Sequence, residues 1–161
     1  MTRPGITHRT FVSYIDKSRE YYLDKGYDNP YRWAHHDDVP FARLPKPLAD
    51  CRLGLVTTAA PNEQGGKVRV VYNGPIEPPP DLYTQHLFWH KKATHTDDPG
   101  SYLPIDHLQG LVQTGRLGSL SPRFYGIPTR YSQRETNEQN APAILNACRE
   151  DQVDIALLIP L

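Results

Sequence analysis

The stretch Val153-Asp-Ile-Ala-Leu-Leu-Ile-Pro-Leu161 decides the class of fold. Residues 155–159 are all apolar and lack the alternation of polar and apolar side chains that marks a half-exposed strand. This pattern predicts a strand over residues 153–158 that is buried on both faces, as in the middle of a parallel sheet. We therefore expect an α/β protein with an open, mostly parallel sheet and flanking helices.

A strand of this kind is normally followed by a loop and a covering helix. In open α/β sheets the functional groups lie just beyond the carboxyl ends of the strands. The given sequence stops at this point, so we expect the sheet to be incomplete at the C-terminus. An ordinary C-terminal strand is the alternative.

Strand and helix signals alternate upstream. Apolar runs over residues 53–58 and 68–72 predict two strands, the second closed by a turn at Asn73-Gly74-Pro75. Residues 82–89 and 117–120 predict two further strands. This alternation favours a parallel sheet.

Two helices are expected in the same region. Apolar residues at helical spacing follow Pro104 and stop before Gly115, and a second helix begins at Pro142 and ends near Asp151. Residues 121–140 are polar and rich in turn-forming residues, so we expect a connection there.

We expect one domain with an N-terminal extension. Residues 1–50 would form a helix, capped by Thr10 and ended by Gly26, and then a proline- and aromatic-rich wrapping segment. Residues 51–161 would form the N-terminal part of the α/β domain.

Composition excludes several classes of protein. The 161 residues carry 18 basic and 18 acidic side chains, which argues against a nucleic-acid-binding or polybasic membrane-binding surface. No apolar run approaches the roughly 20 residues of a membrane-spanning helix. Two cysteines suit a reducing compartment, so we expect a cytoplasmic protein.

The densest polar cluster holds three imidazoles and two carboxylates: His86, His90, His95, Asp97 and Asp98. Such side chains can bind zinc, but their spacing matches no helical zinc motif, and Lys91 and Lys92 would repel a cation. We expect a polar loop that holds an anionic substrate or a neighbouring chain. A metal-dependent hydrolase is the alternative.

Three other side chains are candidates for ligand binding. Thr57 and Thr58 end a predicted strand, where their hydroxyls would bind a ligand or cap the loop. Arg123 would clamp a carboxylate or pair with an acidic residue of its own surface. Cys51 and Cys148 are poor nucleophiles, since one precedes its strand and the other lies on an apolar helix face.

Four stretches of the sequence form an ordered set. They are Asn29-Pro-Tyr-Arg-Trp-Ala-His35, Arg52-Leu-Gly-Leu-Val-Thr-Thr-Ala59, Asp97-Asp-Pro-Gly-Ser-Tyr-Leu-Pro-Ile-Asp-His-Leu108 with Gly115-Arg-Leu-Gly-Ser119, and Val153-Asp-Ile-Ala-Leu-Leu-Ile-Pro160. In order and spacing they resemble the selenoprotein B family of the glycine/sarcosine/betaine and D-proline reductases, most closely its short D-proline-type members. The resemblance covers most of the chain, from about residue 11 to residue 161.

The resemblance implies a selenocysteine-dependent oxidoreductase. In that family a strand like residues 155–161 is followed directly by selenocysteine, or by cysteine in some relatives. The catalytic residue would then stand at position 162, behind a UGA codon, and the chain as given would hold no catalytic residue and bind no metal or cofactor. A selenol suits this role because it is largely ionised at neutral pH, whereas a free cysteine is mostly not.

The resemblance also implies partners. A subunit bearing a pyruvoyl group holds the amino-acid or amine substrate, the selenolate attacks a carbon next to the nitrogen, and a dithiol donor supplies the electrons. We thus expect a hetero-oligomer. Glycine, betaine and D-proline all stay open as substrates.

Position alone suggests which side chains line the rim around that selenolate. The seven candidates are Thr57, Thr58, His86, His90, Thr94, Asp97 and Arg123. The alternative is a non-catalytic binding or assembly subunit of 161 residues in the same type of complex.

Overall fold

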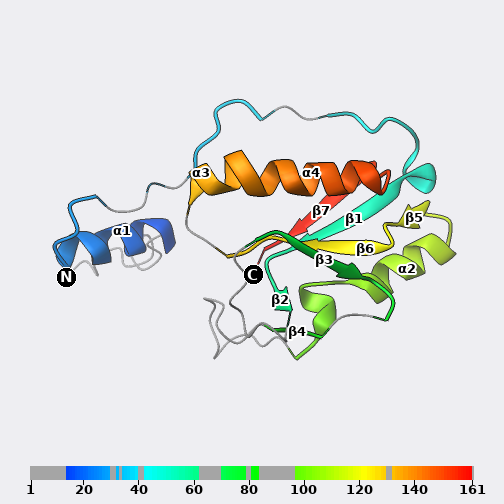
Figure 1. Cartoon of the computed structure of the whole chain (residues 1–161), viewed down its shortest axis with the longest axis horizontal. Coiled ribbons are helices and arrows are strands. Elements are labelled where there is room, and N and C mark those ends of the chain that lie inside the picture. The colour runs from blue at the N-terminus through cyan, green and yellow to red at the C-terminus, as the bar shows by residue number, and fades with distance from the viewer. Residues whose placement is uncertain are drawn as a thin grey trace, which may run out of the picture. The chain divides into compact units, whose positions relative to one another are not determined.

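The structure, a computed structural model, describes residues 14–29, 32, 34–39, 42–61, 70–78, 81–83, 97–129 and 132–160. By its internal contacts the chain divides into two units, Met1–Pro40 and Phe41–Leu161. The sheet belongs to the second unit (Figure 1).

The first unit contains the helix α1 (Tyr14–Asp24). Gly26 follows with a φ of 80°, and its N–H donates to the carbonyl of Leu23 at 3.0 Å while the N–H of Tyr27 donates to that of Tyr22 at 3.0 Å. These two bonds close the helix with a left-handed residue that glycine adopts without strain. The predicted helix end is confirmed, and the Thr10 cap lies outside the described residues.

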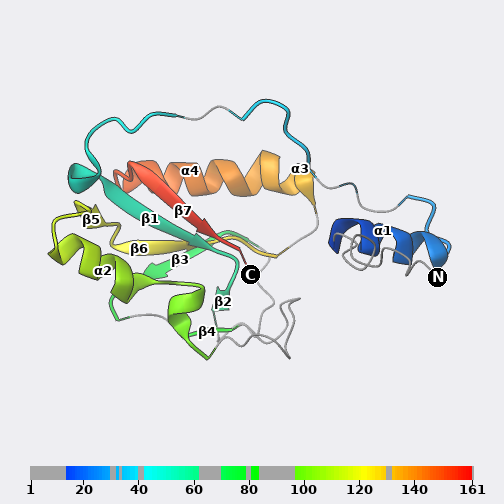
Figure 2. The ribbon, with the colours of Figure 1, turned by 180° about the vertical axis from the view of Figure 1, so that it is seen from behind.

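The second unit is built on a five-stranded sheet. Its strands are β1 (Arg52–Thr57), β3 (Tyr72–Pro75), β5 (Ser119–Leu120), β6 (Arg123–Gly126) and β7 (Ile155–Ile159). Strands β5, β6 and β7 run parallel to β1, and β3 runs antiparallel to β6 (Figures 1 and 2). The predicted α/β class and open, mostly parallel sheet are confirmed.

The central strand is β1. It pairs with β7 along residues 53–57 on one side, so β5 and β6 share its other side. Every residue of β1 after Arg52 is buried.

The strand predicted over residues 153–158 is β7, and within the described residues it does not lie in the middle of the sheet. Strand β7 begins at Ile155 and, within the described residues, pairs with β1 alone, so that Ala156, Leu157 and Leu158 are exposed. An apolar sequence favours coverage of both faces but does not fix which neighbours a strand has.

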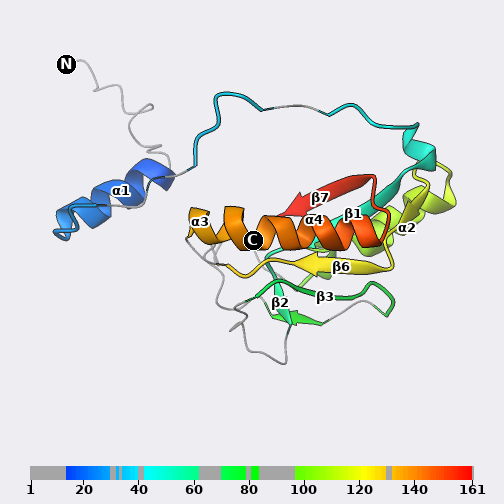
Figure 3. The ribbon, with the colours of Figure 1, turned by 45° about the horizontal axis from the view of Figure 1, so that its top comes forward.

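Helices cover both faces of the sheet (Figure 3). Helix α2 (Ile105–Gln113) packs on the face that holds Leu53, Leu55 and Phe124, and helix α4 (Ala141–Glu150) packs on the face that holds Val56 and Tyr125. Short 3₁₀ turns, η1 (Leu48–Asp50) and η3 (Pro99–Ser101), precede β1 and α2. Both predicted helices are confirmed, including the end of the first at Gly115, which has a φ of 70°.

The polar region over residues 121–140 is more ordered than predicted. It contains β6, the short helix α3 (Gln133–Glu135) and a π-helical turn, η4 (Thr136–Asn140), that continues into α4. Phe124 and Tyr125 are both buried, but two apolar residues between polar ones give little strand signal. Pro142 lacks an N–H for the helix ladder, and the wider π turn directly before it accommodates that loss.

The turn expected at Asn73-Gly74-Pro75 is part of strand β3 instead. A Cβ at Gly74 would lie 2.8 Å from the ring of Phe124, so glycine allows the two strands to approach, and Pro75 is tolerated on an edge strand. Residues 68 and 69 lie outside the described part of the chain. Strand β4 (Leu82–Tyr83), which pairs antiparallel with β2 (Ala60–Pro61), is the described part of the strand predicted over residues 82–89.

Candidate functional site

The carboxyl edge of the sheet brings four residues into one row. Thr57 is the register partner of Gly126 on one side and of Ile159 on the other, and Gly126 is also the partner of Tyr72. Because β1, β6 and β7 are parallel, their carboxyl ends meet here, where ligands of open α/β sheets bind. The chain leaves β7 beside Thr57.

Two predicted rim residues, Thr57 and Thr58, lie at this edge. Only 1% of Thr57 is exposed, and its hydroxyl oxygen accepts a hydrogen bond from the N–H of Ala59 at 3.2 Å. Thr57 therefore fixes the turn after β1, which was the other role considered for it. Thr58 is half-buried, and its carbonyl accepts from the hydroxyl of Thr129 at 3.5 Å.

Tyr72 is a polar residue of this row that sequence reasoning missed. Its ring covers Gly126, where a Cβ would overlap the ring carbons. Its phenol oxygen is buried and has no hydrogen-bond partner among the described residues, and this burial raises the pKa of Tyr72. The sequence showed Tyr72 only as the last residue of a strand, so nothing marked it.

Asp97 lies on the segment that enters α2. Tyr102 and Leu103, just after it, share an apolar cluster with Ala59, which places this segment at the carboxyl edge. Asp97 is exposed, and its neighbour Asp98 accepts from the N–H of Gly100 at 2.9 Å and so caps the turn η3. The other three rim candidates, His86, His90 and Thr94, lie outside the described residues, as does His95.

The structure does not bring Arg123 to this row. Arg123 begins β6, three residues before Gly126 and so about 10 Å along the strand from the carboxyl edge. Its guanidinium donates to Asp151 at 2.6 Å and to Glu150 at 2.8 Å. It pairs with carboxylates of its own surface, the alternative considered for it.

Comparison with known proteins finds no match among family models, curated proteins or solved structures. Of the helices in the described ranges, none is long and apolar enough to cross a membrane. The same residues contain no group of three or more His, Cys, Asp or Glu side chains placed to hold a metal ion.

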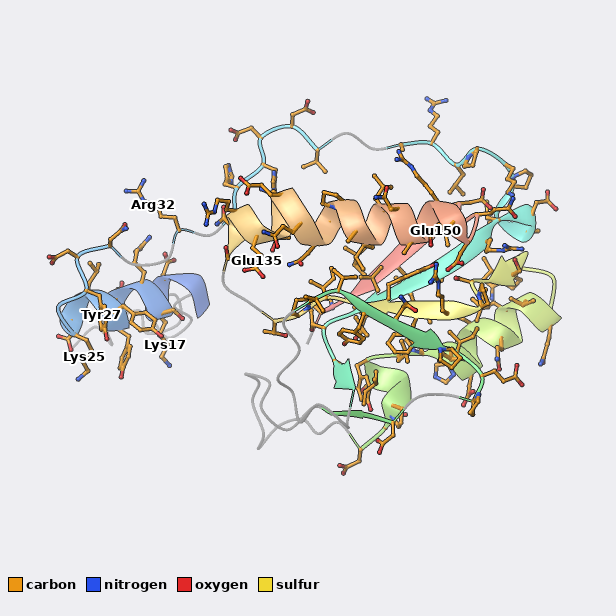
Figure 4. All side chains as sticks on the ribbon, in the orientation of Figure 1. Lys17, Lys25, Tyr27, Arg32, Glu135 and Glu150 are labelled. Atoms are coloured by element: carbon orange, nitrogen blue, oxygen red, sulfur yellow. The ribbon has the colours of Figure 1, made fainter. Side chains whose placement is uncertain are left out.

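A second polar cluster lies at the opposite, amino edge and centres on Asp151, which follows α4. The Asp151 carboxylate accepts from Arg123, from the hydroxyl of Tyr125 at 2.6 Å and from that of Ser121 at 3.3 Å. Desolvation by itself would raise the pKa of Asp151, but these hydrogen bonds outweigh it and lower the pKa. Figure 4 labels the neighbouring Glu150 at this end of α4.

The Asp151 cluster fastens the end of α4 to the sheet. Tyr125 and Ser121 are almost fully buried, and Arg52 also donates to the carbonyl of Asp151 at 2.8 Å. The nearby thiol of Cys148 is buried, which raises its pKa, so it is a poor nucleophile at neutral pH. No sequence signal linked Arg123 to Asp151, because 28 residues separate them.

Proposed function

We propose that this chain is part of a selenocysteine-dependent reductase that cleaves a C–N bond of an amino acid or amine with electrons from a dithiol. The proposal rests on the four stretches that resemble the selenoprotein B family. The open, mostly parallel α/β sheet is compatible with it.

The observation that carries the proposal is the pairing of β1 with β7. These strands belong to two of the four stretches, and their register pairs Thr57 with Ile159. A residue that follows β7 would therefore enter the carboxyl edge of the sheet next to Thr57 and Thr58. A selenocysteine or cysteine at position 162 would have the position expected of a nucleophile in an open α/β sheet.

In this proposal the residues of the chain form one wall of the site. Thr57 holds the turn after β1 through its bond to Ala59, and Thr58 and Asp97 present polar groups at the rim. A selenolate supplies a nucleophile that is ionised at neutral pH. A partner subunit with a pyruvoyl group presents the substrate, and a reducing cytoplasm supplies the dithiol.

The activity test uses the complete gene product together with its pyruvoyl-bearing partner. For each C–N bond cleaved we expect one dithiol to be oxidised to a disulfide and hydrogen to replace nitrogen on carbon. Glycine, sarcosine and betaine would release ammonia or an amine, whereas D-proline would open to a linear amino acid that keeps its nitrogen. Formation of the released amine, or of the ring-opened product of D-proline, would be followed against oxidation of dithiothreitol. A complex that cleaves none of the four substrates would contradict the proposal.

A matched pair of variants tests whether the carboxyl edge is the site. Thr58→Ala changes a half-buried residue of the rim, and Thr114→Ala changes an exposed residue after α2. We expect Thr58→Ala to lower kcat/KM at least about tenfold, a loss of about 1.4 kcal/mol of transition-state binding, and Thr114→Ala to leave it unchanged. Equal effects of the two would place the site elsewhere.

A further inference from the structure

The outer edge of β7 lacks the features that protect sheet edges. Within the described residues β7 pairs only with β1, and its five residues include no charge, proline or glycine. Leu158 is 66% exposed and Leu157 is 37% exposed. Natural edge strands are usually short, charged or interrupted by proline, since an open apolar edge pairs with other chains.

The opposite edge of the sheet has that protection. Strand β3 has four residues, among them Gly74 and Pro75, and Pro75 has no N–H to donate. Unlike the edge at β3, the edge at β7 is therefore suited to pairing with a further strand.

The hydrogen-bonding groups of β7 alternate between β1 and the open side. The carbonyls of Leu53 and Thr57 in β1 accept from the N–H groups of Ser121 and Ile127, on the side of β5 and β6, so the alternate residues Gly54 and Val56 face β7. In the register that pairs Leu53 with Ile155, the N–H and C=O of Ile155, Leu157 and Ile159 therefore point toward β1, and those of Ala156 and Leu158 point away from it. Ala156 and Leu158 thus offer two donors and two acceptors at the open edge.

We propose that β7 pairs antiparallel with β7 of a second copy of this chain, about a twofold axis at Leu157. Leu157 then lies opposite the partner's Leu157 as a non-hydrogen-bonded pair, and Ala156 exchanges two hydrogen bonds with the partner's Leu158. The pairing is self-complementary, as an isologous dimer requires, and it uses all the groups that point outward.

The side chains fit this register as well as the backbone does. The partner's Leu158, the largest exposed side chain on its face of β7, lies opposite Ala156, the smallest residue of the strand. Apolar residues meet only apolar residues on both faces of the new pair. Two five-stranded sheets thereby join into one.

A disulfide tests the register. In Leu157→Cys the two equivalent Cα atoms of this non-hydrogen-bonded pair would lie about 4.5 Å apart, within the range that a disulfide spans. In Ile155→Cys, the control on the same face, they would lie about 13 Å apart. The native Cys51 and Cys148 are buried and do not compete.

On mild oxidation we expect Leu157→Cys to form a covalent dimer on a non-reducing gel and Ile155→Cys to stay monomeric. A mixture of Ile155→Cys and Ile159→Cys should give the mixed dimer. A monomeric Leu157→Cys, or equal crosslinking of Leu157→Cys and Ile155→Cys, would overturn the proposal.

Molar mass in solution tests the dimer without oxidation. We expect the 161-residue chain to be a dimer by light scattering, and Leu158→Lys to shift the monomer–dimer midpoint to at least about tenfold higher concentration. Val70→Lys is the matched control, because Val70 is 70% exposed but lies just before the other edge strand, β3. Circular dichroism checks that both variants fold.

A monomeric or polydisperse parent chain would overturn the dimer, as would Leu158→Lys that dimerises like the parent. If a strand of another protein pairs with this edge instead, the parent chain should be monomeric and Leu157→Cys should form no covalent dimer. The dimer is tested on the 161-residue chain and involves no catalytic residue, so its failure leaves the reductase proposal untouched.

Discussion

The ring of Tyr72 lies across the backbone of Gly126, its register partner on the neighbouring strand. A Cβ at position 126 would overlap the ring carbons, so this contact requires glycine. Beyond the ring, the buried phenol oxygen has no hydrogen-bond partner in the part of the chain that the structure describes. The ring thus covers the backbone at the carboxyl edge of the sheet, and its hydroxyl, unpaired within that part of the chain, lowers the stability of the fold.

Gly126→Ala is expected to destabilise the protein by about 1–3 kcal/mol, because the new methyl group forces the Tyr72 ring out of its position. Urea unfolding measures the free energy. Gly110→Ala is the control, since nothing lies within 4 Å of its Cβ position on α2, and we expect it to stabilise by about 0.5–1 kcal/mol.

The clash between the methyl group added by Gly126→Ala and the Tyr72 ring disappears when the ring is removed. In a Tyr72→Ala background, Gly126→Ala should therefore cost less than in the parent by about 1 kcal/mol or more. Additive effects of the two substitutions would show that the ring does not occupy this place.

Tyr72→Phe is expected to raise stability by about 1 kcal/mol, because it removes a buried hydroxyl that bonds to none of the described residues. Tyr125→Phe is the matched control. Its hydroxyl bonds to Asp151 at 2.6 Å and to Ser121 at 2.9 Å, so its loss should cost about 1–3 kcal/mol. A drop in melting temperature for Tyr72→Phe would mean that the hydroxyl has a partner.

Asp151→Asn is expected to destabilise the protein by about 2–4 kcal/mol at pH 7, since Arg123, Tyr125 and Ser121 all lose a charged acceptor. Glu150→Gln is the control: its side chain is 69% exposed, and a surface pair with Arg123 contributes at most about 1 kcal/mol.

The effect of Asp151 should depend on pH. The folded pKa of Asp151 lies below its unfolded value, so its stabilisation is complete above an unfolded pKa of about 3.9 and is lost as the pH falls through the folded pKa. Thermal unfolding between pH 7 and pH 2.5 should show the parent approaching Asp151→Asn in stability at the acid end. A constant difference across this range would contradict the account.

The sequence predicts elements whose signal is local. The helix α2 follows from apolar residues at helical spacing between Pro104 and Gly115, and β1 follows from an unbroken apolar run. Strand β6 is not predicted because Phe124 and Tyr125 are its only large apolar residues, and their burial depends on neighbours distant in sequence.

The candidate site also contains residues that a local sequence signal predicts and residues that it does not. Thr57 is placed at the carboxyl edge by the end of its own strand, which the sequence predicts. Arg123 is predicted at the rim because it follows the end of a strand, but that strand is β5. Its partner Asp151 lies 28 residues away in the sequence. Side-chain pairs of this kind depend on how strands are ordered, and strand order has no local signal.

The central claim is that this chain belongs to a reductase with selenocysteine or cysteine directly after Leu161. The most direct measurement is the nucleotide sequence of the gene from the codon of Leu161 through about 90 codons beyond it. The account predicts UGA or a cysteine codon at position 162, then an in-frame cysteine within a few codons and an amphipathic helix pattern. A UAA or UAG codon, or a codon for any other residue, would contradict it.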